Sequence, residues 1–293
     1  MDTILLRVYK KRWKIFSNKV KRNKINSFKT KLDRSREIEK NTEGENMASV
    51  QTKDYIVQLI KEEILSGVMK PGEELAQEAL AERLGVSRMP IREALQNLVQ
   101  EGFAVRLPNR HIQSVVLSAQ QIHDVFHVIA AMAAENTILV AKKEQMLRRK
   151  NVEQTSQTEF EEDGQSKLFL EQEIEKTPSE QLFQILSGME NALRPEKKAE
   201  WEMVYQERLI SLFENPYLSQ LQGKTMDGYV AYAIEKMGDK QQKLEQLRRI
   251  TEGIAENNEQ KIRMGLREYY LSYADAFVER WEKKAEETEK TEK

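Results

Sequence analysis

Apolar residues recur every three or four positions in three consecutive segments between residues 55 and 100, a spacing that predicts three amphipathic helices. The first helix ends near Gly67, before a turn at Pro71-Gly72, and the second is the shortest. The apolar positions of the three helices are Ile56, Leu59, Ile60 and Ile64; Leu80, Ala81 and Leu84; and Ile91, Ala94, Leu95 and Leu98.

The junction between the second and third helices consists of residues that favour a tight turn. Gly85 suits a left-handed backbone position after a short helix, and Ser87 is a preferred N-cap residue. Pro90 then falls in the first turn of the next helix, where its missing N–H costs nothing. We therefore predict that the third helix begins near Arg88, which gives the order of a helix-turn-helix.

Polarity alternates after the third helix, over residues 103–107 and again over residues 112–116, as in two short β-strands. The segment between them contains Pro108 and Asn109, and asparagine tolerates a positive φ at the tip of a turn. The pattern predicts a two-stranded hairpin, or wing, that presents Arg110 near its tip.

Two arginines lie four residues apart on the exposed flank of the third helix, at Arg88 and Arg92. A recognition helix presents its N-terminal residues to base edges in the major groove. Arginine can pair bidentately with guanine, and a good pair discriminates between bases by about 1–3 kcal/mol. The alternative is a capped, solvated helix face, but the helix order, the turn and the wing together favour DNA binding.

The run from Ile64 to Val116, with the segments ILSGVMKPGEEL and LAERLGVSRMPIREAL, resembles the winged helix-turn-helix of the GntR transcription regulators. The resemblance implies sequence-specific binding to double-stranded operator DNA. It departs from the family at the wing tip, where a glycine is usual and this chain has Asn109. The residues that match the family's DNA contacts are Ser87, Arg88, Met89, Arg92, Asn109 and Arg110.

Helical spacing continues after Ser118, a predicted cap, and is interrupted by a polar segment over 151–166 that we expect to be a linker. Further helices are predicted near 179–192, 196–214, 216–237, 240–256 and 259–285. The predicted fold is mainly α, with a winged helix-turn-helix and two-stranded wing over 50–117, an all-helical bundle over 118–285 for effector binding and dimerisation, and a charged tail over 286–293.

The charge of the chain is unevenly distributed although its net value is only −1. Residues 1–46 hold 14 Lys and Arg against 6 Asp and Glu, a net +8, which leaves 33 against 42 in the remainder, a net −9. Residues 1–46 are interpreted either as a basic, disordered arm that adds nonspecific DNA affinity or as a misassigned start before Met47.

Composition excludes several classes of function. The absence of cysteine excludes disulfides, cysteine-ligated zinc and thiol catalysis. No apolar run approaches the roughly 20 residues that span a bilayer, so we expect a cytoplasmic protein with no membrane partner. Acidic clusters such as Glu161-Glu162-Asp163 are accompanied by no glycine-rich phosphate loop and no nucleophile elbow, so we predict that the chain is not an enzyme.

The helical C-terminal region is similar to the FadR-like branch of the family, called FCD. The resemblance implies a divalent metal held by one Asp and three His, with a small carboxylate effector in the same cavity. Matching the family's Asn-Pro element to Asn215-Pro216 places the four ligand positions at Glu202, Gln206, Leu247 and Tyr269.

This chain departs from that metal-ligand pattern. Its three histidines, His111, His123 and His127, all precede residue 130. Since such metals bind imidazole nitrogens, we predict no metal and no cofactor. His123 and His127 lie four apart, as a metal pair would, but with no third ligand we expect packing at a hinge or an interface.

An anionic effector, such as an organic acid or an acyl-CoA-like ligand, would then need basic side chains to balance its charge. Tyr205, Tyr269 and Tyr270 could form a cavity wall or could simply be core. The basic candidates, which are otherwise ordinary surface charges, are Arg208, Arg248, Arg249, Arg263 and Arg267.

These patterns together predict a dimeric, effector-responsive transcription factor, most simply a repressor. A two-fold symmetric protein requires a two-fold symmetric site, so the two heads would read an inverted repeat. The alternative is a small-molecule sensor that acts through partner proteins and carries a degenerate DNA-binding head.

Overall fold

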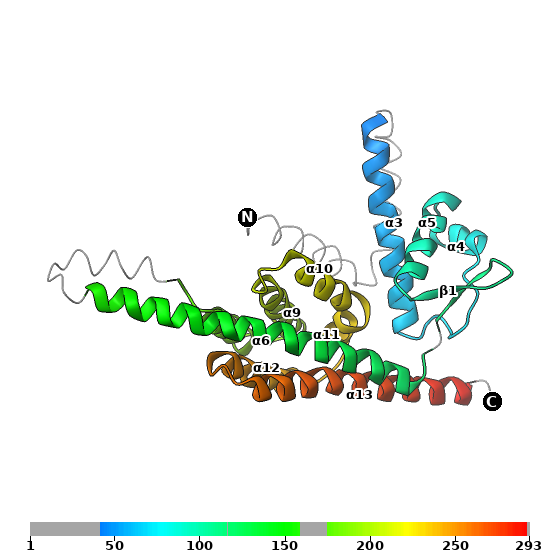
Figure 1. The fold of residues 1–293 in the computed structure, drawn as a ribbon. Helices are drawn as coiled ribbons and strands as arrows, with labels where there is room; N and C mark the ends of the chain where they lie inside the picture. Colours follow the sequence, from blue (N-terminus) through cyan, green and yellow to red (C-terminus); the bar gives the residue numbers. More distant parts are fainter. Residues whose placement is uncertain (1–41, 116, 159–174, 292–293) are drawn as a thin grey trace. The chain divides into compact units, whose positions relative to one another are not determined.

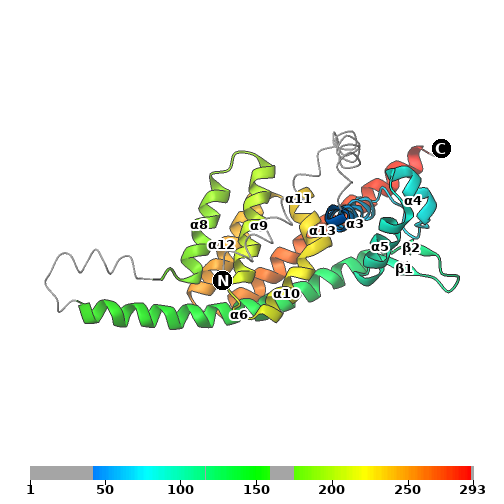
Figure 2. The ribbon, with the colours of Figure 1, turned by 90° about the horizontal axis from the view of Figure 1, so that it is seen from above.

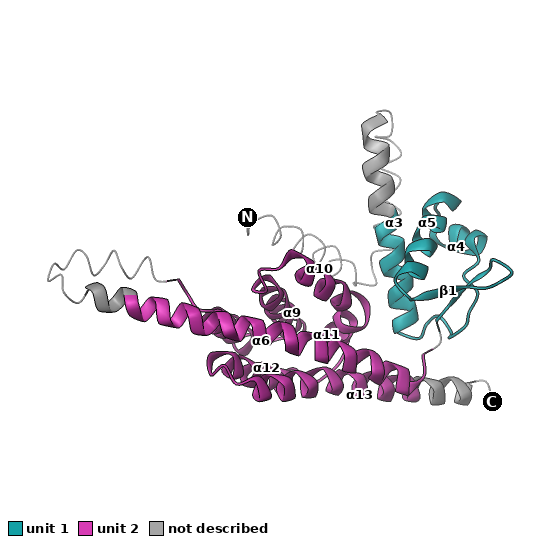
Figure 3. Ribbon diagram, in the orientation of Figure 1, with its two compact units in different colours: residues 1–116 teal, residues 117–293 magenta. Residues whose placement is uncertain are grey.

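The computed structural model describes the backbone of residues 42–115, 117–158 and 175–291, with side chains described over 53–115, 117–153 and 175–283. The chain divides into two compact units, residues 1–116 and residues 117–293, shown in separate colours in Figure 3. Most of the predicted basic arm over 1–46 lies outside the described residues. The division is close to the domain boundary expected at 117/118.

Unit 1 is a winged helix-turn-helix (Figure 1), and the predicted fold class is confirmed. Its two strands pair antiparallel, with Val105 opposite Gln113. The apolar positions that predicted the three helices are buried except Leu59 and Leu84, which are half-buried. The elements are α3 (Thr42–Leu65), α4 (Gln77–Leu84), α5 (Arg88–Gln100), β1 (Ala104–Arg106) and β2 (Ile112–Ser114).

Two details of unit 1 differ from the sequence prediction. Helix α3 begins at Thr42, before the expected domain start at residue 50. The strict alternation expected in the first wing strand is also wrong, because Phe103 and Ala104 are both buried and Val105 is exposed. Phe103 precedes β1, and its buried ring is packed beneath the amine of Lys61, 4.9 Å from the ring centroid.

Unit 2 is helical throughout its described residues, in which α6 and α13 pack along each other (Figures 1 and 2). Helix α12 packs on both of them, and α8 and α9 form a neighbouring pair. Its elements are α6 (Ala119–Thr158), α8 (Pro178–Glu190), α9 (Pro195–Ser211), α10 (Pro216–Thr225), the π-helix η1 (Met226–Val230), α11 (Ala231–Lys236), α12 (Lys240–Ala255) and α13 (Glu259–Thr291).

Three helix boundaries in unit 2 were predicted wrongly. Helix α6 continues through the expected linker as far as Thr158, and residues 159–166 lie outside the described part. The single helix expected over 216–237 is interrupted at Asp227 and Gly228, where Gly228 has φ 104° and ψ −111°, a conformation open mainly to glycine. Helix α13 runs into the predicted tail and ends at Thr291.

The prediction that no apolar run approaches the length of a membrane span was also wrong. The segment Ala119–Glu153 of α6 is long and apolar enough to cross a bilayer by length and composition alone. Within unit 2, however, 56% of its most apolar window is buried. The apolar residues of α6 therefore serve as one wall of the helical core.

A carboxylate from α6 fixes the start of α8. The fully buried Glu144 accepts hydrogen bonds from the backbone N–H of Ser179, at 2.9 Å, and from its hydroxyl, at 2.7 Å. Thr177 and Glu180 add a capping box at the same end. Helix α8 thus begins at a place set by both its own sequence and its neighbour.

Candidate nucleic-acid interface and the polar core of unit 2

The turn before α5 takes the predicted backbone conformation. Gly85 ends α4 in the left-handed region, with φ 65° and ψ 34°. Ser87 occupies the N-cap position of α5 with an extended backbone, but its hydroxyl accepts no capping hydrogen bond, so this part of the prediction was wrong. The exposed hydroxyl and the first amides of α5 therefore face solvent at a helix N-terminus, where anions are favoured.

The first two turns of α5 separate a buried face from a basic, exposed one. Ile91 and Leu95 are fully buried, whereas Met89 and Arg92 are exposed. Among the residues that the structure describes, none forms a hydrogen bond or ion pair with Arg92. Arg88 Nη2 lies 2.9 Å from Glu78 Oε1, but both side chains are at least 70% exposed, and such surface pairs contribute little stability and exchange readily.

The wing tip is polar and exposed, but its strained residue is not the one predicted. Arg110 takes the positive φ, at 69°, in place of Asn109. Asn109 instead accepts a hydrogen bond from the His111 N–H through its side-chain oxygen, at 3.1 Å. Arg110 is itself held by a backbone bond from its N–H to the Leu107 carbonyl, at 2.9 Å. All six predicted DNA contacts are exposed side chains of unit 1.

Comparison with known proteins identifies this unit. Residues 52–112 match the family described as "Bacterial regulatory proteins, gntR family". Unit 1 therefore belongs to the GntR family. The match agrees with the predicted regulatory role of this unit.

The similarity to curated relatives extends over a stretch only somewhat longer than the GntR match. An uncharacterised helix-turn-helix regulator of Agrobacterium vitis is 29% identical over 89 residues, 30% of this chain and 52% of its own length. The uncharacterised regulator YdhC of Bacillus subtilis is 30% identical over 100 residues, 33% of this chain and 45% of its own. The chain thus spans about half the length of these relatives. Among solved structures, E. coli McbR/YncC is 14% identical with a TM-score of 0.49, over 78% of this chain and 98% of its own.

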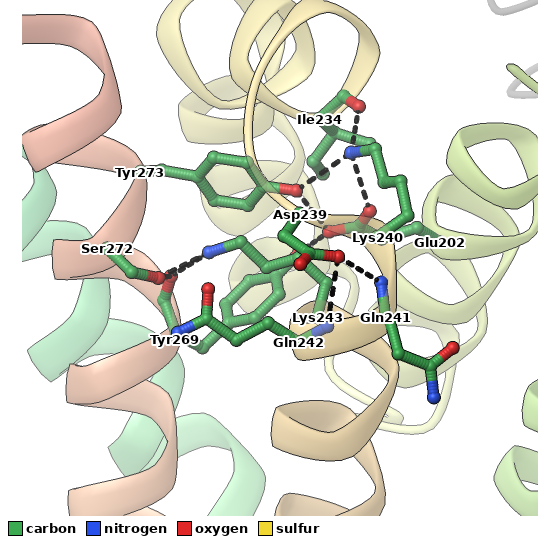
Figure 4. Close-up of polar contacts among 10 residues, drawn as sticks. All are labelled: Glu202, Ile234, Asp239, Lys240, Gln241, Gln242, Lys243, Tyr269, Ser272 and Tyr273. Atoms are coloured by element: carbon green, nitrogen blue, oxygen red, sulfur yellow. Dashed lines mark hydrogen bonds and ion pairs between the residues drawn. The ribbon is translucent and has the colours of Figure 1, made fainter. Parts of the chain in front are cut away.

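The core of unit 2 contains a fully buried carboxylate, Glu202 of α9, surrounded by polar partners (Figure 4). Its Oε1 accepts hydrogen bonds from the hydroxyls of Tyr269, at 2.7 Å, and Tyr273, at 2.5 Å. Its Oε2 lies 3.0 Å from the Lys240 amine, which also donates to the carbonyl of Ile234. Both oxygens of the carboxylate are therefore satisfied, and its charge is balanced.

A second lysine of α12, Lys243, is buried beside this pair, and no carboxylate of the described part of the chain forms an ion pair with it (Figure 4). Its amine donates to the Tyr269 carbonyl, at 3.0 Å, and to the Ser272 hydroxyl, and lies 3.6 Å from the centroid of the Tyr273 ring. Burial, aided by the charge of Lys240, lowers the pKa of Lys243 to about 7, against the opposing effect of Glu202. Burial also raises the pKa of both tyrosines.

Three of the four residues predicted to line an effector cavity meet in this polar core. Glu202 and Tyr269 are bonded directly, and Gln206 accepts a hydrogen bond from the hydroxyl of Tyr270 through Oε1, at 3.4 Å. The amide nitrogen of Gln206 is buried and has no hydrogen-bond partner among the residues that the structure describes. Leu247 is also fully buried, but it is an apolar part of the core.

These four positions do not fit a divalent metal. Leu247 offers no ligand atom, and Tyr269 uses its hydroxyl proton to bind Glu202. The Lys240 amine already supplies the positive charge beside the carboxylate. Across the described residues, moreover, no group of three or more His, Cys, Asp or Glu is arranged to hold a metal ion.

The predicted arginines do not line the polar core. Its basic groups are Lys240 and Lys243, which were not predicted from the sequence. Most of these arginines are paired at the surface, Arg208 with Gln181, Arg248 with Glu190, Arg249 with Glu268, and Arg263 with Glu135, while Arg267 is exposed. A signal for Lys243 was present in the sequence. It lies in helical register with Leu247, Ile250 and Ile254, and this register marks the buried stripe of α12.

Proposed function

We propose that this protein regulates transcription as an effector-responsive repressor of the FadR-like branch, and that it binds an inverted repeat in double-stranded DNA as a dimer. The observation that carries the proposal is the exposed Arg92, projecting from the N-terminal half of a helix whose opposite face is fully buried. A helix that presents an arginine with no partner among the described residues is suited to read guanine in the major groove.

The neighbouring side chains support the same role. Ser87 and Arg88 lie at the helix N-terminus, where they can bind phosphates, and Met89 offers an apolar contact to a base. At the wing, Asn109 and Arg110 are exposed and can reach the minor groove or the sugar-phosphate backbone. Binding through these few basic groups should weaken steeply with salt, since each phosphate contact releases counterions.

The test of DNA binding compares two arginine substitutions in the full chain. We expect Arg92→Ala to weaken binding to the DNA upstream of the protein's own gene by about 10-fold or more per half-site, since one base-reading arginine contributes about 1–3 kcal/mol. The matched control is Arg248→Ala, which removes a surface arginine of unit 2. Fluorescence anisotropy with specific and scrambled duplexes measures both effects.

Two outcomes would refute this role. One is an Arg92→Ala protein that selects the same duplex as the unchanged protein with equal affinity. The other is an unchanged protein that binds no duplex more tightly than scrambled DNA, which would favour the alternative of a sensor that acts through protein partners. In either form the protein would act in the cytoplasm, alongside the DNA or its partners.

For the effector, we propose that an organic acid or an acyl-CoA-like ligand binds at the polar core formed by Glu202, Gln206 and Tyr269, against the apolar Leu247. The unpartnered amide nitrogen of Gln206 supports this site, because a buried donor without an acceptor costs about 1–3 kcal/mol that a ligand oxygen would recover. Lys243 would balance the charge of an acid, since Lys240 is already paired with Glu202.

A thermal-shift screen of organic acids and acyl-CoA compounds tests the effector site. A ligand at this site should raise the melting temperature of the unchanged protein and should lose that effect in Gln206→Leu. Zinc and manganese should give no shift, because the four positions do not offer a metal-ligand set. Stabilisation by either metal would contradict the metal-free proposal. If the ligand raises the melting temperature of Gln206→Leu as much as that of the unchanged protein, the effector binds at another site.

A further inference from the structure

Three arginines in the helix-turn-helix of unit 1 differ in their partners. Arg83 of α4 forms an ion pair with Glu63 of α3, with 2.7 Å between Arg83 Nη2 and Glu63 Oε2. Among the described residues, Arg92 of α5 has no such partner. Arg88, the first residue of α5, pairs with Glu78 in the first turn of α4. Glu78 is therefore placed to act on one of the predicted DNA contacts.

This ion pair joins the two helices across the turn between them. Arg88 Nη2 lies 2.9 Å from Glu78 Oε1, and both side chains are exposed. A guanidinium group is planar and carries five N–H donors. Since Glu78 contacts it through one nitrogen, the carboxylate can fix the direction of the plane while other donors remain available to a second acceptor.

The DNA-binding head has no excess of positive charge over its described side chains. Residues 53–115 contain 8 Lys and Arg against 9 Asp and Glu, a net charge of −1 with histidine taken as neutral. Acidic side chains also lie beside both DNA-reading elements. Glu78 lies beside α5, and at the wing Glu74 Oε1 lies 2.6 Å from His111 Nδ1. General attraction to phosphates is thus weakened at the surface that meets DNA.

Two kinds of DNA acceptor are open to Arg88, and Glu78 affects them differently. To bind a phosphate, Arg88 has to leave Glu78 or bring the carboxylate close to a second anion, and either change costs free energy. A guanine edge is uncharged and accepts from two N–H groups of one guanidinium. Arg88 can therefore bind guanine while it keeps its contact with Glu78.

We infer that Glu78 is a specificity-determining residue of the DNA-binding head, which directs Arg88 toward a base edge and disfavours its binding to phosphates. Because it acts through Arg88, Glu78 is a positioning residue. The inference rests on the proposed function and narrows the role of Arg88, which by its place in the helix could bind either group. The carboxylate lowers affinity for DNA that lacks the operator sequence and costs little on the operator.

Fluorescence anisotropy of the full chain with two duplexes tests this inference. The specific duplex is the one that the unchanged protein selects from a random library, and the other is its scrambled sequence. Glu78→Gln should tighten binding to the scrambled duplex by about 2- to 5-fold, the range expected for an exposed ion pair. Binding to the specific duplex should stay the same or weaken, so the ratio of the two affinities should fall.

A salt titration and a matched variant distinguish positioning from a simple loss of charge. In Glu78→Gln, Arg88 is released to a further phosphate, so the slope of log K against log salt should steepen by about 0.9 on the scrambled duplex only. Glu82→Gln removes the same charge from another exposed side chain of α4, and no described residue forms an ion pair with Glu82. This control should leave the affinity ratio unchanged, and neither variant should change the melting temperature.

Arg88→Ala supplies the second test, because it removes the group that Glu78 positions. In the Arg88→Ala protein, where Arg92 still reads the specific duplex, adding Glu78→Gln should not change the affinity ratio further. If the ratio falls as much as it does with Arg88 present, Glu78 acts on the DNA itself and the inference is overturned. An equal effect of Glu78→Gln and Glu82→Gln would also overturn it.

The outcomes separate this inference from the proposed function. An unchanged protein that selects no duplex over scrambled DNA would overturn both. A protein that selects a duplex, loses that selection in Arg92→Ala and keeps its affinity ratio in Glu78→Gln would overturn the role of Glu78 alone.

Discussion

The buried amine of Lys243 makes the stability of unit 2 depend on pH in a direction that the structure fixes. Its pKa is lowered from 10.5 to about 7, chiefly by burial, and at about 1.36 kcal/mol per pH unit this amounts to roughly 5 kcal/mol of cost when the amine is charged. Lys240 adds to this cost, whereas Glu202, Asp275 and Glu268 reduce it.

The sign follows from comparing the folded and unfolded chains. Below about pH 7 both carry the proton on Lys243, so the cost is present in full. Between about pH 7 and pH 10.5 the unfolded chain keeps a proton that the folded chain has released, so stability rises with pH. Lys243→Met has no proton to release at this position. Its free energy of unfolding, relative to that of the unchanged protein, should therefore fall by up to about 1.4 kcal/mol for each unit that the pH rises over this range.

Urea unfolding of both proteins at pH 6, 7, 8 and 9 measures this difference. Staying at or below pH 9 limits ionisation of unfolded tyrosines, whose ordinary pKa is 10.0. Tryptophan fluorescence is suited to the task because Trp201 and Trp281 both lie in unit 2. Loss of the hydrogen bonds from Lys243 shifts the stability of the variant by a pH-independent amount. A difference between the two proteins that stays constant from pH 7 to pH 9 would therefore refute the reasoning.

Two further predictions concern packing within unit 2. Gly188→Ala should destabilise the protein by about 1–3 kcal/mol, because the added Cβ would lie 2.7 Å from the Trp201 ring, and thermal melting followed by fluorescence would detect the loss. Glu144→Ala should cost a similar amount or more, since Ser179 and Arg148 lose their shared acceptor. Amide hydrogen exchange should then show faster opening at the start of α8 in particular, and unchanged protection there would contradict the assigned cap.

The DNA-binding head was largely predictable because its signals are local. The left-handed turn at Gly85 and the buried stripe around Ile91 depend on residues close in sequence, and the structure has both. Finer details were not predictable, because several local arrangements satisfy the same residues. At the wing tip Asn109 uses its side chain to close the turn, and the positive φ passes to Arg110.

Helix boundaries in unit 2 were less predictable because the local sequence pattern did not mark them. The polar residues after Asn151 suggested a linker, yet the backbone of α6 stays helical to Thr158. Conversely, helical spacing continued unbroken across Gly228, where the backbone leaves the helical region. A single glycine in an otherwise regular pattern gives little warning of such a break.

The polar core was predicted only in part. Glu202 and Tyr269 were named as neighbours through the family resemblance, and they share a hydrogen bond. The lysines were missed because Lys240 and Lys243 occur in the polar sequence at the start of α12, where lysine usually faces solvent. Only the three-dimensional packing of α9, α12 and α13 brings Lys240 to the Glu202 carboxylate and buries Lys243 against Tyr269.

The pairing of Glu202 with Lys240 has a consequence for how the protein would be purified. Because Lys240 neutralises the charge of Glu202 within the same chain, this carboxylate needs no metal ion from the solution as a counterion. On the proposal that this centre binds no metal, chelating agents should leave its ion pair and hydrogen bonds unaltered.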